Sequence, residues 1–181
     1  HLQFKKRDSY GKKIKGYTKI VLCSAYHSVD SNEHDEFNGI TQTILNRLPN
    51  DTSFLFGHDI NCNVGVSHGN EDPFNSTVGP NGLDNRNQKG MKFLQHLCSL
   101  NMRIANSFFT KPNYTTWKNF NTANPSHHML DVFSISKSIF KHVTNCETIP
   151  HGVDHTDHTA TALKLVDITR HRDIDVALVI I

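Results

Sequence analysis

The 181-residue sequence lacks several features that would restrict its class. No apolar run approaches the roughly 20 residues that a membrane-spanning helix requires, so we expect no membrane association. No apolar stretch follows the basic N-terminal residues, which predicts a nuclear or cytoplasmic rather than a secreted protein. Repeats and low-complexity segments are also missing, and a hydrophobic content of 36% with 20% charged residues is typical of a globular domain.

Cysteine is scarce, and the four cysteines Cys23, Cys62, Cys98 and Cys146 form no Cys-x-x-Cys pair. This spacing argues against a structural zinc knuckle and predicts no disulfide framework. Three of them lie among apolar residues, so we expect buried thiols in a reducing compartment.

Charge is small in sum but unevenly distributed. Seven of the 19 Lys and Arg residues fall within residues 1–19, where Asp8 is the only acid. On charge alone we expect a solvated basic hairpin or edge strand, although a basic arm beside an acidic body also suits a polyanion. We divide the chain into a basic segment, 1–16, a domain, 17–166, and a charged and apolar tail, 167–181.

Apolar periodicity predicts a strand, a helix, a strand, a long loop, a second helix and then several strands. The expected strands are 17–26, 53–56, 102–106, 114–117, 130–136, 142–148 and 159–166. A helix is expected over 34–48, from a stripe of Phe37, Ile40, Thr41, Ile44, Leu45 and Leu48. A second is expected over 88–101, with Met91, Leu94, Leu97 and Cys98 facing inward, after a long loop at 65–87. This order predicts a mixed α/β fold with a β-rich second half.

Asp59 and Asn61 follow the short apolar strand at 53–56 and Gly57. On an extended segment, two residues spaced by two point to the same side. Such an Asp can activate a water molecule, and such an Asn can donate to a phosphate oxygen. The alternative is an Asx-rich turn that closes the strand.

Asp131 lies inside an otherwise apolar strand, where a carboxylate is costly unless it is paired or binds a ligand. No obvious partner lies nearby in the sequence, which favours a functional role over a structural one.

A cluster of histidines and acids precedes the last strand of the domain. Asp157 and His158 can supply a metal-binding carboxylate and an imidazolium that faces a phosphate, and Asp154 with His155 is an alternative pair. His151, His155 and His158 have a spacing that suits zinc on a helix, but Gly152 and the flanking β pattern disfavour a helix there.

Weaker candidates complete the set of polar and aromatic residues. Tyr26 ends its strand and can bond a phosphate through its hydroxyl group, but half-burial alone also explains such a residue. Asn85, Arg86, Asn87 and Lys89 are candidates for nucleic-acid contact or for capping the next helix, and Trp117 for base stacking or core packing. The other histidines are expected at the surface.

Taken in order, these motifs resemble the endonuclease/exonuclease/phosphatase superfamily, and within it the endonuclease-like domains of non-LTR retrotransposons. The likeness spans roughly residues 17–166. Its pieces are 24–27, 56–61, 79–90, 104–109, 115–117, 130–131 and 156–158. Ser28 and Val132 stand where the family pattern has Pro and Tyr.

The resemblance implies a four-layer α/β sandwich with its N-terminal part missing, since the family's first-half Asn and Glu have no counterpart here. It implies Mg²⁺- or Mn²⁺-assisted attack of water on a phosphodiester of DNA or RNA. Asp59 would activate the water, Asn61 and Tyr26 would hold phosphate oxygens, and His158, supported by Asp131, would stabilise the developing charge. Asp157 would help to place the metal.

The sequence leaves two alternatives to the nuclease open. In the first, the chain is an inactive remnant that at most binds nucleic acid. In the second, it is a phosphatase of the same superfamily that acts on a phospholipid or an inositol phosphate. The loop at 79–90 favours the nuclease, because the resemblance to the retrotransposon branch rests on it.

Overall fold

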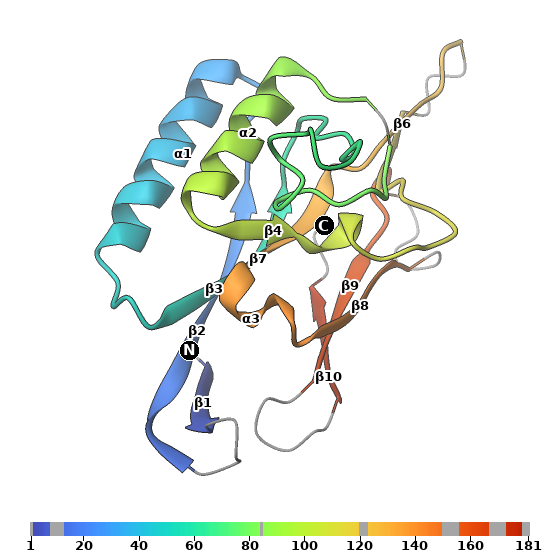
Figure 1. The fold of residues 1–181 in the computed structure, drawn as a ribbon. Coiled ribbons are helices and arrows are strands. Elements are labelled where there is room, and N and C mark those ends of the chain that lie inside the picture. Colours follow the sequence, from blue (N-terminus) through green and yellow to red (C-terminus); the bar gives the residue numbers. More distant parts are fainter. Residues whose placement is uncertain are drawn as a thin grey trace.

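Two helices cover one face of a five-stranded sheet, and a three-stranded sheet covers the other face (Figure 1). This arrangement is seen in a computed structural model, which describes residues 2–7, 13–83, 85–119, 123–149, 156–166 and 173–178. The layers match the expected α/β sandwich, and the order of strands and helices agrees with the sequence pattern.

The larger sheet has the strand order β1-β2-β3-β7-β4. Its strands are β1 (Leu2–Arg7), β2 (Lys13–Tyr26), β3 (Thr52–Asp59), β7 (Asp131–Ser136) and β4 (Met102–Ile104). β2 and β3 are parallel and are joined by a helix, as a parallel pair requires, whereas all other neighbours are antiparallel. β1 and β2 form the expected hairpin at the edge of the sheet.

The helices begin at polar caps. The Asp30 carboxylate accepts hydrogen bonds from two backbone N–H groups at the start of α1 (Ser31–Asn46), and Asn87 caps α2 (Gln88–Ser99) in the same way. The inward faces differ from the prediction in part. Ile40 and Ile44 of α1 and Met91 of α2 are exposed.

The inward face of α1 is rotated from the predicted apolar stripe. Thr41 and Leu45 of the predicted stripe are buried and His34 joins them, because spacings of seven and four place these three on one side of the helix, whereas Ile40 and Ile44 are exposed. In α2, Phe93, Leu94 and Leu97 fill the corresponding positions.

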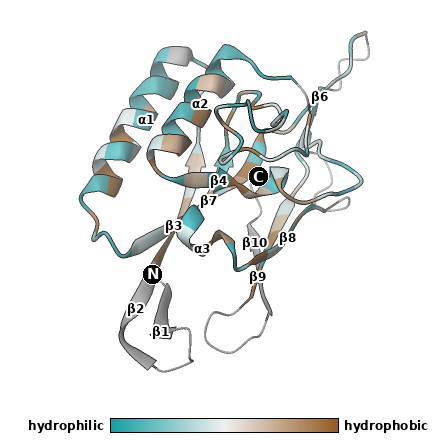
Figure 2. Ribbon diagram, viewed as in Figure 1, coloured by the Kyte–Doolittle hydropathy of each residue, from teal (hydrophilic) through white to brown (hydrophobic). Residues whose placement is uncertain are grey.

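The central strands are buried on both faces, and apolar residues run along them (Figure 2). Because strand side chains alternate, Phe56 and Val132 pack against the helices, whereas Leu55 and Phe133 pack against the second sheet. This alternation decides which polar residues of β3 and β7 can meet at the ends of the strands.

The second sheet has the order β10-β9-β8. Its strands are β8 (Val143–Thr148), β9 (Thr161–Val166) and β10 (Asp173–Leu178), so that part of the segment expected as a tail pairs with β9. The strand expected over 114–117 starts only at Trp117, where β5 (Trp117–Asn119) pairs with β6 (Ser126–His128).

Two short helices, η1 (Ala105–Ser107) and α3 (Lys137–Phe140), complete the elements of the chain that the structure describes. All four cysteines are free thiols, and Cys62 and Cys146 are buried. Among the described residues, no helix combines the length and the apolar character needed to span a membrane.

Candidate active site

Three polar residues form one row across neighbouring strands. Tyr26 of β2 is in register with Asp59 of β3, which is in register with Asp131 of β7. Residues in register lie on the same face of a sheet, and here that face is the one covered by the second sheet. Tyr26, at 66% exposure, opens to solvent, whereas both aspartates are buried. The row therefore leads from the interior of the sandwich to its surface.

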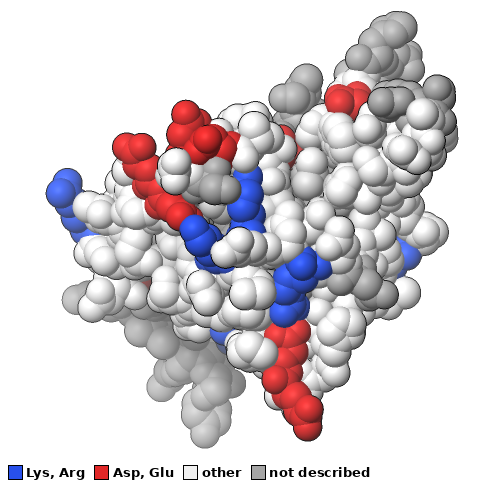
Figure 3. Space-filling view, turned by 90° about the horizontal axis from the view of Figure 1, so that it is seen from above, with Lys and Arg blue, Asp and Glu red and all other residues white. Residues whose placement is uncertain are grey.

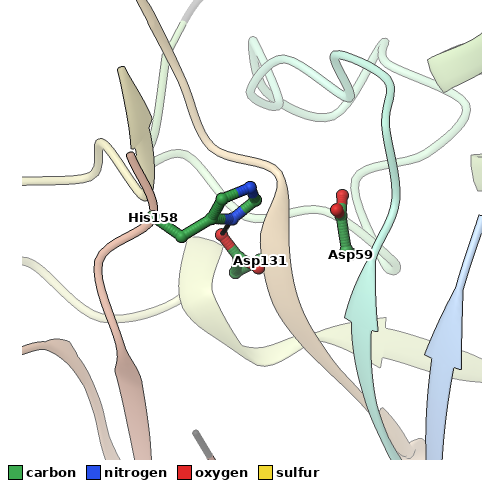
Figure 4. A group of neighbouring side chains, drawn as sticks. All are labelled: Asp59, Asp131 and His158. Atoms are coloured by element: carbon green, nitrogen blue, oxygen red, sulfur yellow. Dashed lines mark hydrogen bonds and ion pairs between the residues drawn. The ribbon is translucent and has the colours of Figure 1, made fainter. Parts of the chain in front are cut away.

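Asp131 has a partner that the local sequence did not reveal. Its Oδ2 lies 2.9 Å from Nδ1 of His158, which reaches it from the segment before β9 (Figure 4). The hydroxyl oxygen of Thr116 accepts the backbone N–H groups of Leu130 and Asp131 and fixes the start of β7. The other carboxyl oxygen of Asp131, Oδ1, is buried and has no hydrogen-bond partner among the residues that the structure describes. The bond between Asp131 and His158 sets the direction of the imidazole ring.

The pKa values of both aspartates of the site are raised above the ordinary value. Burial raises the pKa of Asp131 to about 6, although the bond to His158 acts in the opposite direction. Burial also raises the pKa of Asp59, partly offset by the N–H of Asn61 and by His158, while Asp157 raises it further. Asp59, Asp131 and His158 each offer one ligand atom within 4.8 Å of the others.

Asn61 lies on a turn rather than on an extended segment, which corrects the prediction for this residue. Its φ of 41° is in the left-handed region, and its N–H donates to Oδ1 of Asp59, as in an Asx turn. The side chain therefore does not simply repeat the direction of Asp59. Its Nδ2 donates to the backbone carbonyl of His27 and leaves one N–H of the amide for another acceptor.

Asp157 precedes His158 and is exposed. Its Oδ2 accepts a hydrogen bond of 2.7 Å from Nε1 of Trp117. The polar edge of Trp117 is thus bonded to Asp157. This contact is additional to the two roles considered for Trp117 from the sequence, base stacking and core packing.

Mg²⁺ binds through one or two carboxylates and keeps several water molecules. Asp157 can meet this requirement because its carboxylate is exposed, and its charge raises the pKa of Asp59. The ligand atoms that lie within 4.8 Å of one another belong to Asp59, Asp131 and His158. Asp131 and His158 fit it less well, since each holds the other. The donor set is hard and rich in oxygen, which suits Mg²⁺ or Mn²⁺ better than a soft metal.

Three of the four residues expected to contact nucleic acid, Arg86, Asn87 and Lys89, bond to other parts of the protein. The Arg86 guanidinium donates to the backbone oxygens of Val64 and Val66 and to both carboxyl oxygens of Asp72. Asn87 caps α2, which is the alternative that the sequence left open, and Asn85 is exposed. Lys89 donates to the backbone oxygens at Ser28 and Val29, just beyond Tyr26.

A cluster of buried histidines lies on the opposite face of the same strands and corrects the expectation of surface histidines. His34 of α1 and His27 and His58 of the sheet side are almost fully buried, and the ring of each contacts Phe93 of α2. Nε2 of His27 lies 3.1 Å from Nδ1 of His58, whose Nε2 lies 2.6 Å from the Ser134 hydroxyl.

Burial lowers the pKa of His27 to about 2 and that of His58 to about 3, so both rings are neutral. The alternation of β3 carries the signal that sequence reasoning missed, because His58 continues the inward-facing series of Phe54 and Phe56.

His151, Asp154 and His155, named for the zinc alternative and for the second Asp-His pair, lie outside the residues that the structure describes.

Figure 3 looks onto the end of the sheet at which β2 and β3 finish. Acidic and basic side chains are interspersed on this face, and wide uncharged areas lie between them. On this face, the described residues thus form no broad basic platform for a polyanion.

The fold is shared with two solved nucleases. The endonuclease domain of TRAS1, a telomere-specific non-LTR retrotransposon, superimposes with a TM-score of 0.52 over 77% of this chain, at 13% identity. The 3′-5′ exonuclease NExo from Neisseria meningitidis gives a TM-score of 0.52 over 81% of the chain, at 11% identity. The chain spans 54% of the first protein and 60% of the second.

The sequence alone matches no protein-family model and no curated protein. The chain nevertheless has the fold of these two solved structures, and the predicted α/β sandwich is confirmed.

Proposed function

We propose that this site hydrolyses a phosphodiester bond of nucleic acid with the help of Mg²⁺ or Mn²⁺. The observation that carries the proposal is the Asp131–His158 pair beside Asp59, all three with ligand atoms within 4.8 Å, at the end of two central strands. The fold of two nucleases supports it.

Asp59 is the residue that orients the attacking water and removes its proton. Its pKa is raised by burial and by Asp157, which brings the carboxylate closer to the basicity that an effective general base needs. Asn61 lies next to it and keeps one amide N–H for a phosphate oxygen, and the exposed Tyr26 hydroxyl is placed for a second.

His158 stabilises negative charge as it develops on the phosphate. Asp131 holds Nδ1 of the imidazole, so Nε2 is the ring nitrogen that faces substrate. The bond to Asp131 fixes the orientation of the ring, as a carboxylate does in other Asp–His pairs.

Asp157 is the residue that would hold the metal ion, which leaves the Asp59 carboxylate to take the proton of water. When bound, Mg²⁺ would neutralise phosphate charge and help to bring substrate and water together. DNA is the expected substrate and RNA the alternative, and both present the same phosphodiester to these residues.

Nicking of supercoiled plasmid DNA tests the proposal. We expect the purified protein to nick the plasmid in Mg²⁺ but not in EDTA, and Asp59→Ala and His158→Ala to lower the rate by about 100-fold or more. His127→Ala is the matched control, because His127 is exposed on β6 and takes no part in the proposed site. Unchanged nicking in both site variants would contradict the assignment, and DNA binding without nicking would favour the inactive remnant.

A further inference from the structure

Trp117 is the only tryptophan of the chain, and its side chain meets the candidate site at Asp157. The indole Nε1 donates to Oδ2 of Asp157 at 2.7 Å. An indole has one N–H donor in a fixed direction, so this bond determines how the carboxylate is turned. Oδ1 of Asp157 takes no part in it.

The backbone around Trp117 is tied to the same segment. Trp117 and His158 form an isolated β-bridge, Lys118 N–H donates to the carbonyl of Asp157, and Thr159 N–H donates to the carbonyl of Thr116. The Asp157–Thr159 backbone is therefore positioned without the indole. What the indole adds is control over the Asp157 side chain.

The indole ring also contacts the ring of His128. Its ring lies 5.5 Å from that of His128, tilted by 48°, and His128 Nδ1 lies 2.9 Å from Oδ1 of Asn63. Asn63 belongs to the loop that follows Asp59 and Asn61, and its carbonyl accepts the backbone N–H of Asn87. A continuous set of contacts thus runs from the loop after Asp59, through His128 and Trp117, to Asp157.

We propose that Trp117 is a positioning residue that holds the Asp157 carboxylate in the orientation needed to bind the divalent metal. This inference rests on the proposed function, because it assumes that Asp157 is a metal ligand. It assigns Trp117 a role different from base stacking, since its one polar atom is directed at Asp157 and its ring is engaged by His128. Groups that orient metal ligands in this way affect metal affinity strongly.

Metal binding without turnover is the direct test. Mn²⁺ affinity is measured on the whole protein from the electron paramagnetic resonance signal of free Mn²⁺. We expect Trp117→Phe, which keeps a ring against His128 but has no N–H, to weaken Mn²⁺ binding by about tenfold or more. Asp157→Asn should weaken it at least as much. Tyr114→Phe, which removes a hydroxyl bonded to Phe109 O, is the matched control and should bind as the wild type does.

A measurement on the unaltered protein guards against a variant that fails to fold. Because Trp117 is the sole tryptophan, its emission on excitation at a wavelength selective for indole should change saturably with Mg²⁺, with a midpoint that Mn²⁺ competition reproduces. In nicking assays, Trp117→Phe should need more Mg²⁺ for half-maximal rate and regain most of the maximal rate at saturating Mg²⁺.

The outcomes separate the two proposals. Mn²⁺ binding within twofold of wild type in Trp117→Phe, together with loss in Asp157→Asn, overturns the positioning role and leaves the proposed function standing. Wild-type binding in Asp157→Asn overturns both the role of Trp117 and that of Asp157. Indole emission that ignores bound metal also overturns the role of Trp117, whatever the variants do.

Discussion

The two faces of the central sheet place the neighbouring residues Asp59 and His58 in different surroundings. Asp59, on the face covered by the second sheet, stands in a row with Tyr26 and Asp131, and the pKa values of both acids are raised. His58, one residue earlier, lies on the helix-covered face against His27 and Ser134, and its pKa is lowered to about 3. Burial is the main cause on both faces, and each time it disfavours the charged form.

The difference between Asp59 and His58 shows that two adjacent residues of a strand can have different roles. Alternation gives Asp59 access to Tyr26 and to the surface, whereas it places His58 beneath Phe93. We therefore expect changes on the Asp59 face to alter reaction rate and changes on the His58 face to alter stability.

The largest expected effect is on rate, from Asp131→Asn. The amide keeps the size of the side chain but cannot hold the imidazole of His158 as a carboxylate does, so the nicking rate should fall on the order of 1,000-fold. The thermal unfolding midpoint should stay within a few degrees of wild type. A comparable loss of stability, with the rate per folded molecule preserved, would remove Asp131 from the functional face.

The next effect is on stability, from His58→Ala. Deleting a ring packed against Phe56 and Phe93 leaves a cavity and should cost about 3 kcal/mol of unfolding free energy. The rate measured well below the unfolding temperature should change by less than tenfold. His68→Ala, at an exposed position, is the control and should lie within about 0.5 kcal/mol of wild type.

Acid should weaken the folded state through the buried histidines. Their ordinary pKa is 6.5, and in the folded chain it is about 2 for His27 and about 3 for His58. The unfolded chain therefore binds protons that the folded chain refuses, so this stabilisation is complete above pH 6.5 and is lost as pH falls. Between pH 6.5 and 5 the loss is about 2 kcal/mol per histidine. Urea unfolding at a series of pH values measures it, and a flat profile would contradict the burial.

The smallest effect is the pH dependence of rate. Asp131 must be ionised to support His158, and its pKa is raised to about 6. The rate should therefore fall by about tenfold per pH unit below 6, under conditions where the protein stays folded. Residual activity of Asp131→Asn should lack this step, and an identical step in the variant would assign the titration to another group.

The residues of the candidate site could largely be predicted from the sequence. The apolar strand around Asp131 made its carboxylate conspicuous, and the cluster at Asp157 and His158 lies before the last predicted strand. What could not be predicted was that Asp59 and Asp131 stand opposite each other, because the pairing of β3 with β7 joins segments more than 70 residues apart.

The buried histidines were missed for a related reason. Histidine is common at surfaces. Water is excluded from His27, His34 and His58 only because α1 and α2 pack against the sheet formed by β2, β3 and β7. The same packing turns α1 so that Ile40 and Ile44 stay exposed, against the apolar stripe. Side chains at element ends depend on tertiary contacts that periodicity does not contain.

The most direct test compares two adjacent substitutions, Asp59→Asn and His58→Asn, by plasmid nicking in saturating Mg²⁺ and by urea unfolding. We expect Asp59→Asn to lose at least about 100-fold in rate at nearly wild-type stability, because the amide cannot accept the proton of water. We expect His58→Asn to lose stability and keep most of the rate of the folded molecule. A wild-type rate in Asp59→Asn would contradict the account.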